Sequence, residues 1–154
     1  MSRLQRPDEA LVPQVVVELP IELRYEPNAP DAVLVSDDTG RAALAMRPHF
    51  DDVDQRTLVL RWSHCLAVID GPYNDEARHH HPLYEVGLKQ GHWIAEVRDS
   101  DWLELIRIAV AAVAFVGLKH YVLPMKERTI EVAARELTIA RSDSEPPLAA
   151  VQAL

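Results

Sequence analysis

The sequence contains a single cysteine, Cys65, among its 154 residues, so an internal disulfide is excluded. One free cysteine fits a reducing compartment, and we predict a cytoplasmic location. A long hydrophobic run is also missing, because the longest uncharged stretch, 108–118, is about half of the ~20 residues that a membrane-spanning helix needs. We therefore predict no membrane partner.

Basic residues are scarce. Lys and Arg number 16 against 24 Asp and Glu, which gives a formal net charge of −8. A protein that binds nucleic acid needs a basic face for the phosphates, so we predict no nucleic-acid partner. The sequence also lacks a glycine-rich phosphate loop, a nucleophile elbow and a zinc ribbon. No complete catalytic constellation remains, which favours a non-enzymatic protein.

What the sequence does contain is a series of short β-type segments. Residues 21–26 alternate apolar and charged side chains, and Val-rich or β-branched runs recur along the chain. We predict an α+β fold, mainly antiparallel, as a barrel-like or strongly curved sheet. The strands are expected at 11–19, 21–26, 32–36, 41–46, 57–62, 65–69, 91–97, 120–126, 129–132 and 137–140.

One helix is predicted after Asp99 and Ser100, where a cap is followed by acids in the first turn. Apolar residues recur at steps of three and four from Trp102, and the stretch beyond Arg107 is apolar nearly all round. We therefore predict a long, buried helix at about 101–116. A single α+β domain is expected over 11–141, with flexible termini at 1–10 and 142–154.

The segment 72–93 concentrates acids, imidazoles, phenols, prolines and glycine between the two β-rich halves. Asn74 is expected to cap a turn, with the acids after it in that turn. Aromatic residues near such a connection can form a pocket or an interface, or can close the end of a core. The predicted binding residues are Tyr73, Asn74, Asp75, Glu76, His81, Tyr84 and Trp93.

The histidine triplet 79–81 offers a second chemistry. In an extended segment His79 and His81 share one face, and Glu76 could add a carboxylate to a divalent metal site. A run of three histidines is not a known ligand spacing, and a site normally needs a ligand from a separate element. The favoured interpretation is a polar loop without a cofactor, and the metal site stays as the alternative.

The pattern Pro72-x-Asn74-Asp75-Glu76-Ala77, followed by His81-Pro82-Leu83-Tyr84-x-x-Gly87-Leu88, resembles a family of small, uncharacterised bacterial proteins. The resemblance extends over about residues 20–141. It implies a folded family and no particular activity. His79 and His80 are not part of the family's pattern, which argues against the metal site.

The sequence thus predicts a cytoplasmic binding protein without catalysis, whose partner is a protein or a second copy of itself. In this hypothesis the aromatic residues anchor the partner and the acids steer a basic surface. One alternative is a small metal-dependent enzyme or sensor that uses His79, His81 and an acid. Another is a small-molecule-binding domain with its pocket between the sheet and the Trp102 helix.

Overall fold

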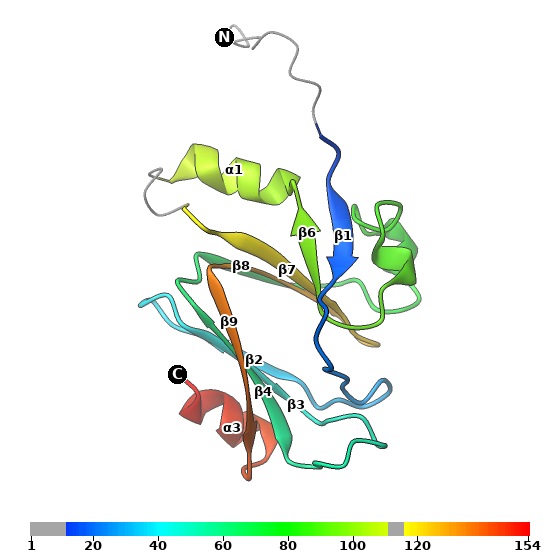
Figure 1. The fold of residues 1–154 in the computed structure, drawn as a ribbon, viewed down its shortest axis with the longest axis vertical. Helices are drawn as coiled ribbons and strands as arrows, with labels where there is room; N and C mark the ends of the chain where they lie inside the picture. The colour runs from blue at the N-terminus through cyan, green and yellow to red at the C-terminus, as the bar shows by residue number, and fades with distance from the viewer. Residues whose placement is uncertain (1–11, 111–115) are drawn as a thin grey trace, which may run out of the picture.

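A computed structural model describes residues 12–110 and 116–154 of the chain. In these residues nine strands form two antiparallel sheets that pack face to face (Figure 1). One sheet has the strand order β1-β6-β7-β8-β5 and the other has the order β2-β3-β4-β9. The α+β prediction and its mainly antiparallel character are confirmed.

The elements have the following bounds. The five-stranded sheet contains β1 (Val15–Glu18), β6 (Ala95–Arg98), β7 (Lys119–Pro124), β8 (Thr129–Ala134) and β5 (Ala67–Gly71). The four-stranded sheet contains β2 (Val33–Ser36), β3 (Ala42–Met46), β4 (Thr57–Ser63) and β9 (Glu136–Ser142). Two α-helices, α1 (Asp101–Ala109) and α3 (Pro146–Gln152), and two short 3-10 helices, η1 (Arg78–His80) and η2 (Leu88–Gln90), complete the described elements.

The predicted hairpin at Asp37 is present and joins β2 to β3. The Asp37 carboxylate accepts hydrogen bonds from the backbone amides of Thr39 and Arg41, each at 3.0 Å. Gly40 has φ +82°, a left-handed conformation that glycine adopts without steric cost. The local sequence therefore fixes this turn.

Two strand pairs bend together from one sheet into the other. The chain passes from β4 to β5 at residues 64–66 and from β8 to β9 at Arg135, while β4 pairs with β9 and β5 with β8. Backbone hydrogen bonds continue through this corner, from Leu66 N to Ala133 O and from Arg135 N to Ser63 O. The corner joins the two sheets along one side without closing a barrel.

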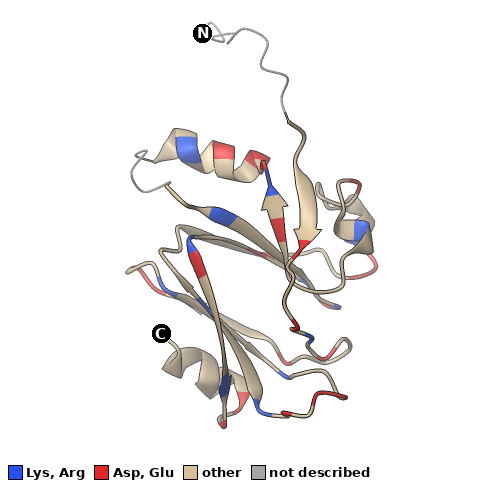
Figure 2. Cartoon of the chain, in the orientation of Figure 1, with Lys and Arg blue, Asp and Glu red and all other residues tan. Residues whose placement is uncertain are grey.

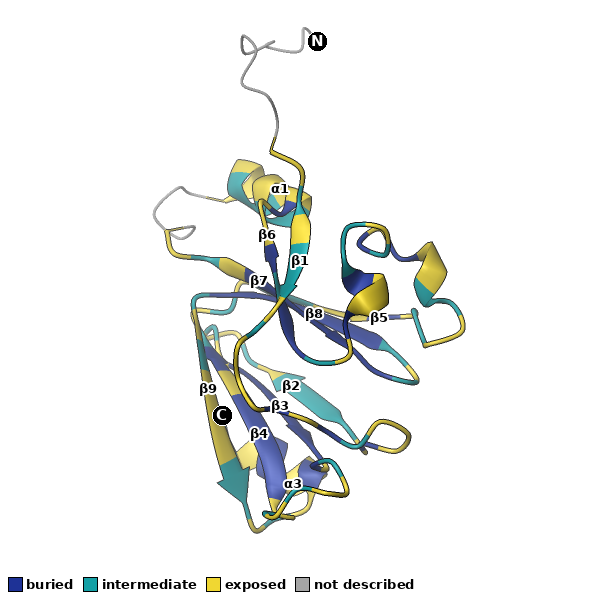
Figure 3. Ribbon diagram, turned by 45° about the vertical axis from the view of Figure 1, so that its right-hand side comes forward, coloured by how far each residue is buried: buried dark blue, intermediate teal, exposed yellow. Residues whose placement is uncertain are grey.

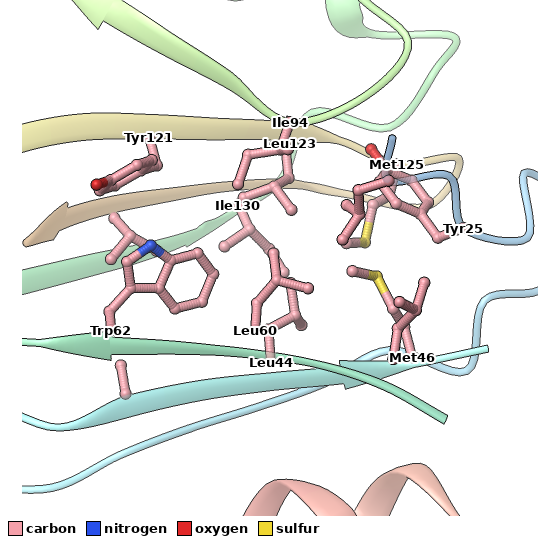
Figure 4. Packing of buried hydrophobic residues seen from close by; sticks show 14 of the residues in the cluster. Tyr25, Leu44, Met46, Leu60, Trp62, Ile94, Tyr121, Leu123, Met125 and Ile130 are labelled. Carbon is pink, nitrogen blue, oxygen red and sulfur yellow. The ribbon is translucent and has the colours of Figure 1, made fainter. Parts of the chain in front are cut away.

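The main core fills the space between the sheets (Figure 4). Leu44, Leu60 and Trp62 project from the four-stranded sheet toward Leu123 and Ile130 of the other. These side chains are at most 2% exposed, and such burial supplies the main driving force for folding. The strands predicted at 41–46 and 129–132 contribute Leu44 and Ile130 to this inward face.

A second, smaller core lies on the outer face of the five-stranded sheet, beneath the segment 72–93. Leu83 and Leu88 pack there on Val97 and Val122. Gly87 has φ +127°, and a side chain at that position would begin 2.8 Å from the backbone oxygen of Val16. Only glycine allows the segment to approach β1 this closely.

Three expectations need correction. The helix α1 is short, because Val110 leaves the helical conformation at φ −121° and ψ 164°; residues 111–115 of the predicted helix lie outside the described residues. It is not buried either, since Leu105 and Ile108 are 66% and 72% exposed. Figure 3 shows α1 mainly in the colours of exposed and intermediate residues. The helix packs on β7, where Trp102 contacts the ring of His120. The barrel-like alternative is also wrong, because the described strands leave separate edges at β1, β5, β2 and β9.

The C-terminal residues, expected to be flexible from 142, instead complete β9 and form α3. Ala149 and Ala150 of α3 are buried against Ala45 and Val59 of the four-stranded sheet. Pro146 and Pro147 stand in the first turn of the helix, where the missing amide hydrogens need no partner. The predicted flexible N-terminus, 1–10, lies outside the described residues.

The strand predicted at 21–26 is reduced to a single bridge between Tyr25 and Pro48. Its alternation is nevertheless real, because Leu23 and Tyr25 are buried while their neighbours Glu22 and Arg24 are exposed. Proline has no amide hydrogen, so Pro48 cannot donate to a continuous ladder.

Candidate functional site

Imidazoles meet carboxylates at two places in the described structure. The first, which we call the histidine cluster, consists of Ser100, His120, Glu131 and His81 on the outer face of the five-stranded sheet. The Glu131 carboxylate lies 2.9 Å from His120 Nε2 and 3.2 Å from His81 Nε2. Ser100 Oγ lies 2.7 Å from His120 Nδ1.

Each member of the histidine cluster comes from a different element. Glu131 lies on β8 between the core residues Ile130 and Val132, so its side chain points to the opposite face. His120 lies on the neighbouring strand β7. Ser100 caps α1 by accepting a hydrogen bond from Leu103 N at 3.1 Å, as its sequence position predicted.

The hydrogen bonds of the cluster determine which ring nitrogens of the two histidines carry protons. His81 Nδ1 accepts the amide hydrogen of Leu83 at 3.0 Å, so Nε2 carries the proton that is donated to Glu131. In a neutral His120 ring, Nδ1 accepts the Ser100 hydroxyl and Nε2 donates to Glu131. Burial raises the pKa of the Glu131 carboxyl, but the hydrogen bonds from His120 and His81 outweigh burial and lower that pKa to about 2.

Ser100, His120 and Glu131 are the residue types of a hydrolytic triad, yet their arrangement is structural. Ser100 is 6% exposed and His120 is 1% exposed, and the Ser100 oxygen already caps α1. Trp102 and Tyr73 cover the two imidazoles at ring-centroid distances of 4.9 Å and 4.7 Å. The cluster therefore links α1 and the segment 72–93 to the sheet.

The second place lies at the end of the sandwich, between the loops at 21–28, 48–53 and 92–93. The loops themselves are at the right in Figure 1. Two pockets of about 680 Å³ and 460 Å³ adjoin there, and His49 and Trp93 line both of them. We call their union the Trp93 groove. The larger pocket is lined also by Ile21, Glu22, Leu23, Arg24, Asp51, Asp52, Val53 and Arg141. The smaller one is lined also by Tyr25, Pro27, Asn28, Asp75, Arg78, His92, Pro124, Met125 and Lys126.

Trp93 is held in the middle of the groove by two edge-to-face contacts. Its ring centroid lies 5.2 Å from that of Tyr25 and 6.0 Å from that of His49. The Tyr25 hydroxyl is fixed in turn by donating to Pro124 O at 2.7 Å, and burial raises its pKa. Trp93 thus presents a half-buried indole on a rigid base.

His49 is oriented by a chain of charges at the rim of the groove. Its Nδ1 is hydrogen-bonded to the Asp51 carboxylate, which also pairs with Arg24 at 3.0 Å. The His49 hydrogen bond, followed by the charge of Arg24, lowers the pKa of Asp51. Among the described residues His49 Nε2 has no partner, so it can bond to a ligand.

Four of the seven predicted binding residues lie at these two places. Trp93 and Asp75 line the groove, whereas His81 and Tyr73 belong to the histidine cluster and its cover. Asn74 caps its turn as predicted, with its side-chain oxygen 2.9 Å from Ala77 N. Glu76 is exposed and Tyr84 half-buried, outside both pockets.

The proposed metal ligands occupy different surroundings. His79 is exposed and contacts the ring of His80 at 3.9 Å, while both ring nitrogens of His81 are engaged by Leu83 and Glu131. Within the described ranges no three His, Cys, Asp or Glu residues are grouped as metal ligands. Metal binding stays a prediction.

Sequence reasoning missed Glu131, His120, His49, Arg24 and Arg78 as site residues. Glu131 carried a usable signal, since an acid between two core residues of a strand must face the other side of the sheet. His49 and Arg24 carried none, because they meet only through the long-range approach of Tyr25 to Pro48.

No known protein family, curated protein or solved structure was found to match the chain. Within its described part, the structure contains no helix that is long and apolar enough to span a membrane.

Proposed function

We propose that this is a non-catalytic binding protein that receives a segment of a macromolecular partner in the Trp93 groove. The observation that carries the proposal is the sharing of His49 and Trp93 by two adjoining pockets. Two pockets that share a tryptophan and a histidine suit an extended ligand better than a compact one.

The side chains of the groove have the character of a binding surface. A tryptophan fixed by rigid neighbours is a typical anchor, because little conformational freedom is lost when it contacts a partner. Charged residues line the larger pocket beside it, among them Arg24, Asp51 and Arg141. Figure 2 shows that acidic and basic positions are spread over both sheets and their loops. This combination of an aromatic centre and a polar rim is common at protein interfaces.

The chemistry around Trp93 supports binding over catalysis. His49 is oriented by Asp51 as a general base would be, but the described residues that line the two pockets include no serine, threonine or cysteine to act as a nucleophile. His49 Nε2 instead offers one directional hydrogen bond beside the anchor.

A displayed peptide library selected on the immobilised full-length protein tests the proposal. Selected peptides would be synthesised, and their dissociation constants measured by fluorescence anisotropy. Trp93→Ala should weaken binding by about tenfold or more, since truncation of an aromatic anchor costs about 2 kcal/mol. His49→Ala should weaken it by a smaller factor.

Leu105→Ala is the matched control, because Leu105 is a large exposed apolar residue on α1, outside both pockets. Unchanged affinity in both groove variants would refute the proposal. Loss of affinity in Leu105→Ala or Tyr84→Ala alone would transfer binding to α1 or to the segment 72–93.

A cytoplasmic location belongs to this proposal and is supported by the single, half-buried Cys65. Membership of the uncharacterised bacterial family is likewise proposed, on the motif that begins at Pro72. The part of that motif around Gly87 has a structural reason here, since Gly87 contacts the backbone of β1.

A further inference from the structure

Arg78 differs from most arginines of this protein in having no acidic partner within the described residues. Seven other arginines pair with a carboxylate, namely Arg24, Arg41, Arg47, Arg56, Arg107, Arg128 and Arg141. Arg78 makes only a long hydrogen bond, from Nη2 to Met125 O at 3.3 Å. Its Nε is buried without a partner in the described structure.

This unpaired guanidinium lines the smaller pocket of the Trp93 groove. Lys126 lines the same pocket, and its ammonium group also lacks an acidic partner among the described residues. Among the described residues Asp75 is the one carboxylate that lines this pocket, and it forms no ion pair with Arg78. Two cations therefore face one anion.

The larger pocket has the opposite balance. Its two arginines, Arg24 and Arg141, are already paired with Asp51 and Asp52 at 3.0 Å and 2.6 Å. Glu22 adds a further negative charge there. The groove is thus polarised along its length, with uncompensated positive charge only at the Arg78 end, in a chain whose net charge is −8.

We infer that the Arg78 end of the Trp93 groove binds an anionic group of the ligand, a carboxylate or a phosphate, while the apolar part of the ligand lies on Trp93. A guanidinium matches both oxyanions with two parallel N–H donors, and no carboxylate among the described residues forms an ion pair with Arg78. The inference rests on the proposed function, because it names the chemistry of the ligand for the same groove.

Phenyl phosphate and phenylacetate are suitable probes, since each joins one anion to one aromatic ring. Benzyl alcohol is the uncharged comparison and inorganic phosphate the comparison without a ring. Titrations of ¹⁵N-labelled full-length protein would follow the Arg78 Nε–H and Trp93 indole N–H signals by NMR. We expect at least one anionic probe to shift both signals saturably, and the weaker shifts of the two comparisons to show that both parts contribute.

Variants give effects of opposite sign. Arg78→Gln should weaken binding of the preferred probe by about tenfold, because a charge-assisted hydrogen bond is lost. Lys126→Gln should weaken it by about threefold, because a nearby charge is lost. Asp75→Asn should strengthen binding by about threefold, since it removes the repelling carboxylate. A gain of affinity cannot result from damage to the fold, so this variant keeps the test valid if Arg78→Gln is unstable.

Arg98→Gln is the matched control, because Arg98 is an exposed arginine on β6 outside both pockets. The inference is overturned if no anionic probe shifts the Arg78 signal, if benzyl alcohol binds as well as the anions, or if Arg98→Gln has the same effect as Arg78→Gln. If binding of the selected peptides still depends on Trp93 in any of these cases, the proposed function stands while the anion inference fails. The stronger of the two anionic probes identifies the group as phosphate or carboxylate.

Discussion

The histidine cluster and the Trp93 groove use the same chemical pair, an imidazole held by a carboxylate, in opposite surroundings. In the cluster the histidine side chains are 2% exposed and Glu131 is 12% exposed. In the groove the side chain of His49 is 12% exposed and that of Asp51 is 46% exposed. In the buried cluster every imidazole nitrogen already has a hydrogen-bond partner, whereas His49 Nε2 in the groove is left for a ligand.

The comparison teaches that an acid with a strongly shifted pKa does not by itself mark a functional site. The pKa of Glu131 is lowered to about 2, and yet its surroundings contain only structural contacts. Such shifts accompany structural networks as well as active sites. Accessibility of the imidazole separates the two roles, and the variants below test that separation.

The largest expected effect follows from removing the carboxylate shared by the two buried histidines. Glu131→Ala should lower the free energy of unfolding by about 3–5 kcal/mol, because two hydrogen bonds to a charged group are lost and both donors stay buried. Urea unfolding measures this. The control Glu136→Ala, at an exposed position on β9, should change stability by less than about 0.5 kcal/mol. Equal effects would refute the assigned role of the cluster.

Acid should weaken the protein through the same group. The folded-state pKa of Glu131, about 2, lies below its ordinary value of 4.5, so its contribution is complete above that value and is lost as pH falls toward 2. The stability difference between the wild type and Glu131→Gln should shrink over this range by about 3 kcal/mol. Urea unfolding at a series of pH values checks the slope, and a constant difference would contradict it.

Replacement of one histidine in each region compares the two directly. His120→Ala should cost about 2–3 kcal/mol, because Glu131 and Ser100 each lose one buried hydrogen bond. His49→Ala should cost about 1 kcal/mol, since the carboxylate that it leaves is in contact with water. Thermal unfolding of both variants under identical conditions gives the ranking. The reverse order would mean that His49 contributes more to stability than the buried His120 does.

The smallest effect on stability is expected at the exposed acid of the groove. Asp51→Asn should leave the unfolding midpoint nearly unchanged, because the carboxylate is half exposed. The same variant should weaken groove-binding peptides severalfold, since His49 loses its orienting partner. Glu85→Gln, which removes the exposed pair with Lys89, is the control for charge alone. A large loss of stability without loss of binding would erase the distinction between the regions.

Local patterns predicted those parts of the fold that depend on neighbours in sequence. The Asp37 hairpin, the Ser100 cap and the Asn74 cap all follow from side chains within four residues of the backbone they bind. The turn signal at Asp37 likewise predicted the strand at 41–46, which lies in the main core. The length of α1 could not be predicted, because an apolar stripe does not reveal how much of it another layer covers.

The candidate site was less accessible to sequence reasoning. The segment 72–93 attracted attention for its density of polar and aromatic residues, and it does contribute Trp93, Asp75 and Arg78 to the groove. The other wall comes from residues 21–28 and 48–53, which lie far away in sequence. Their approach depends on the sandwich as a whole and leaves no periodic signal. The pairing of His81 with Glu131 is long-range in the same way.

The corner between the sheets has a consequence for the speed of folding. It pairs Thr57 with Ser142 and Gly71 with Thr129, so most of the chain lies between partners that must meet. Closing loops of this length costs entropy before the contacts compensate, and proteins with such topologies fold in about milliseconds to seconds. Neither sheet can form completely before the corner forms. The segment β4–β5 supplies one strand to each sheet, and so does the segment β8–β9. We therefore expect the two sheets to fold in one cooperative transition.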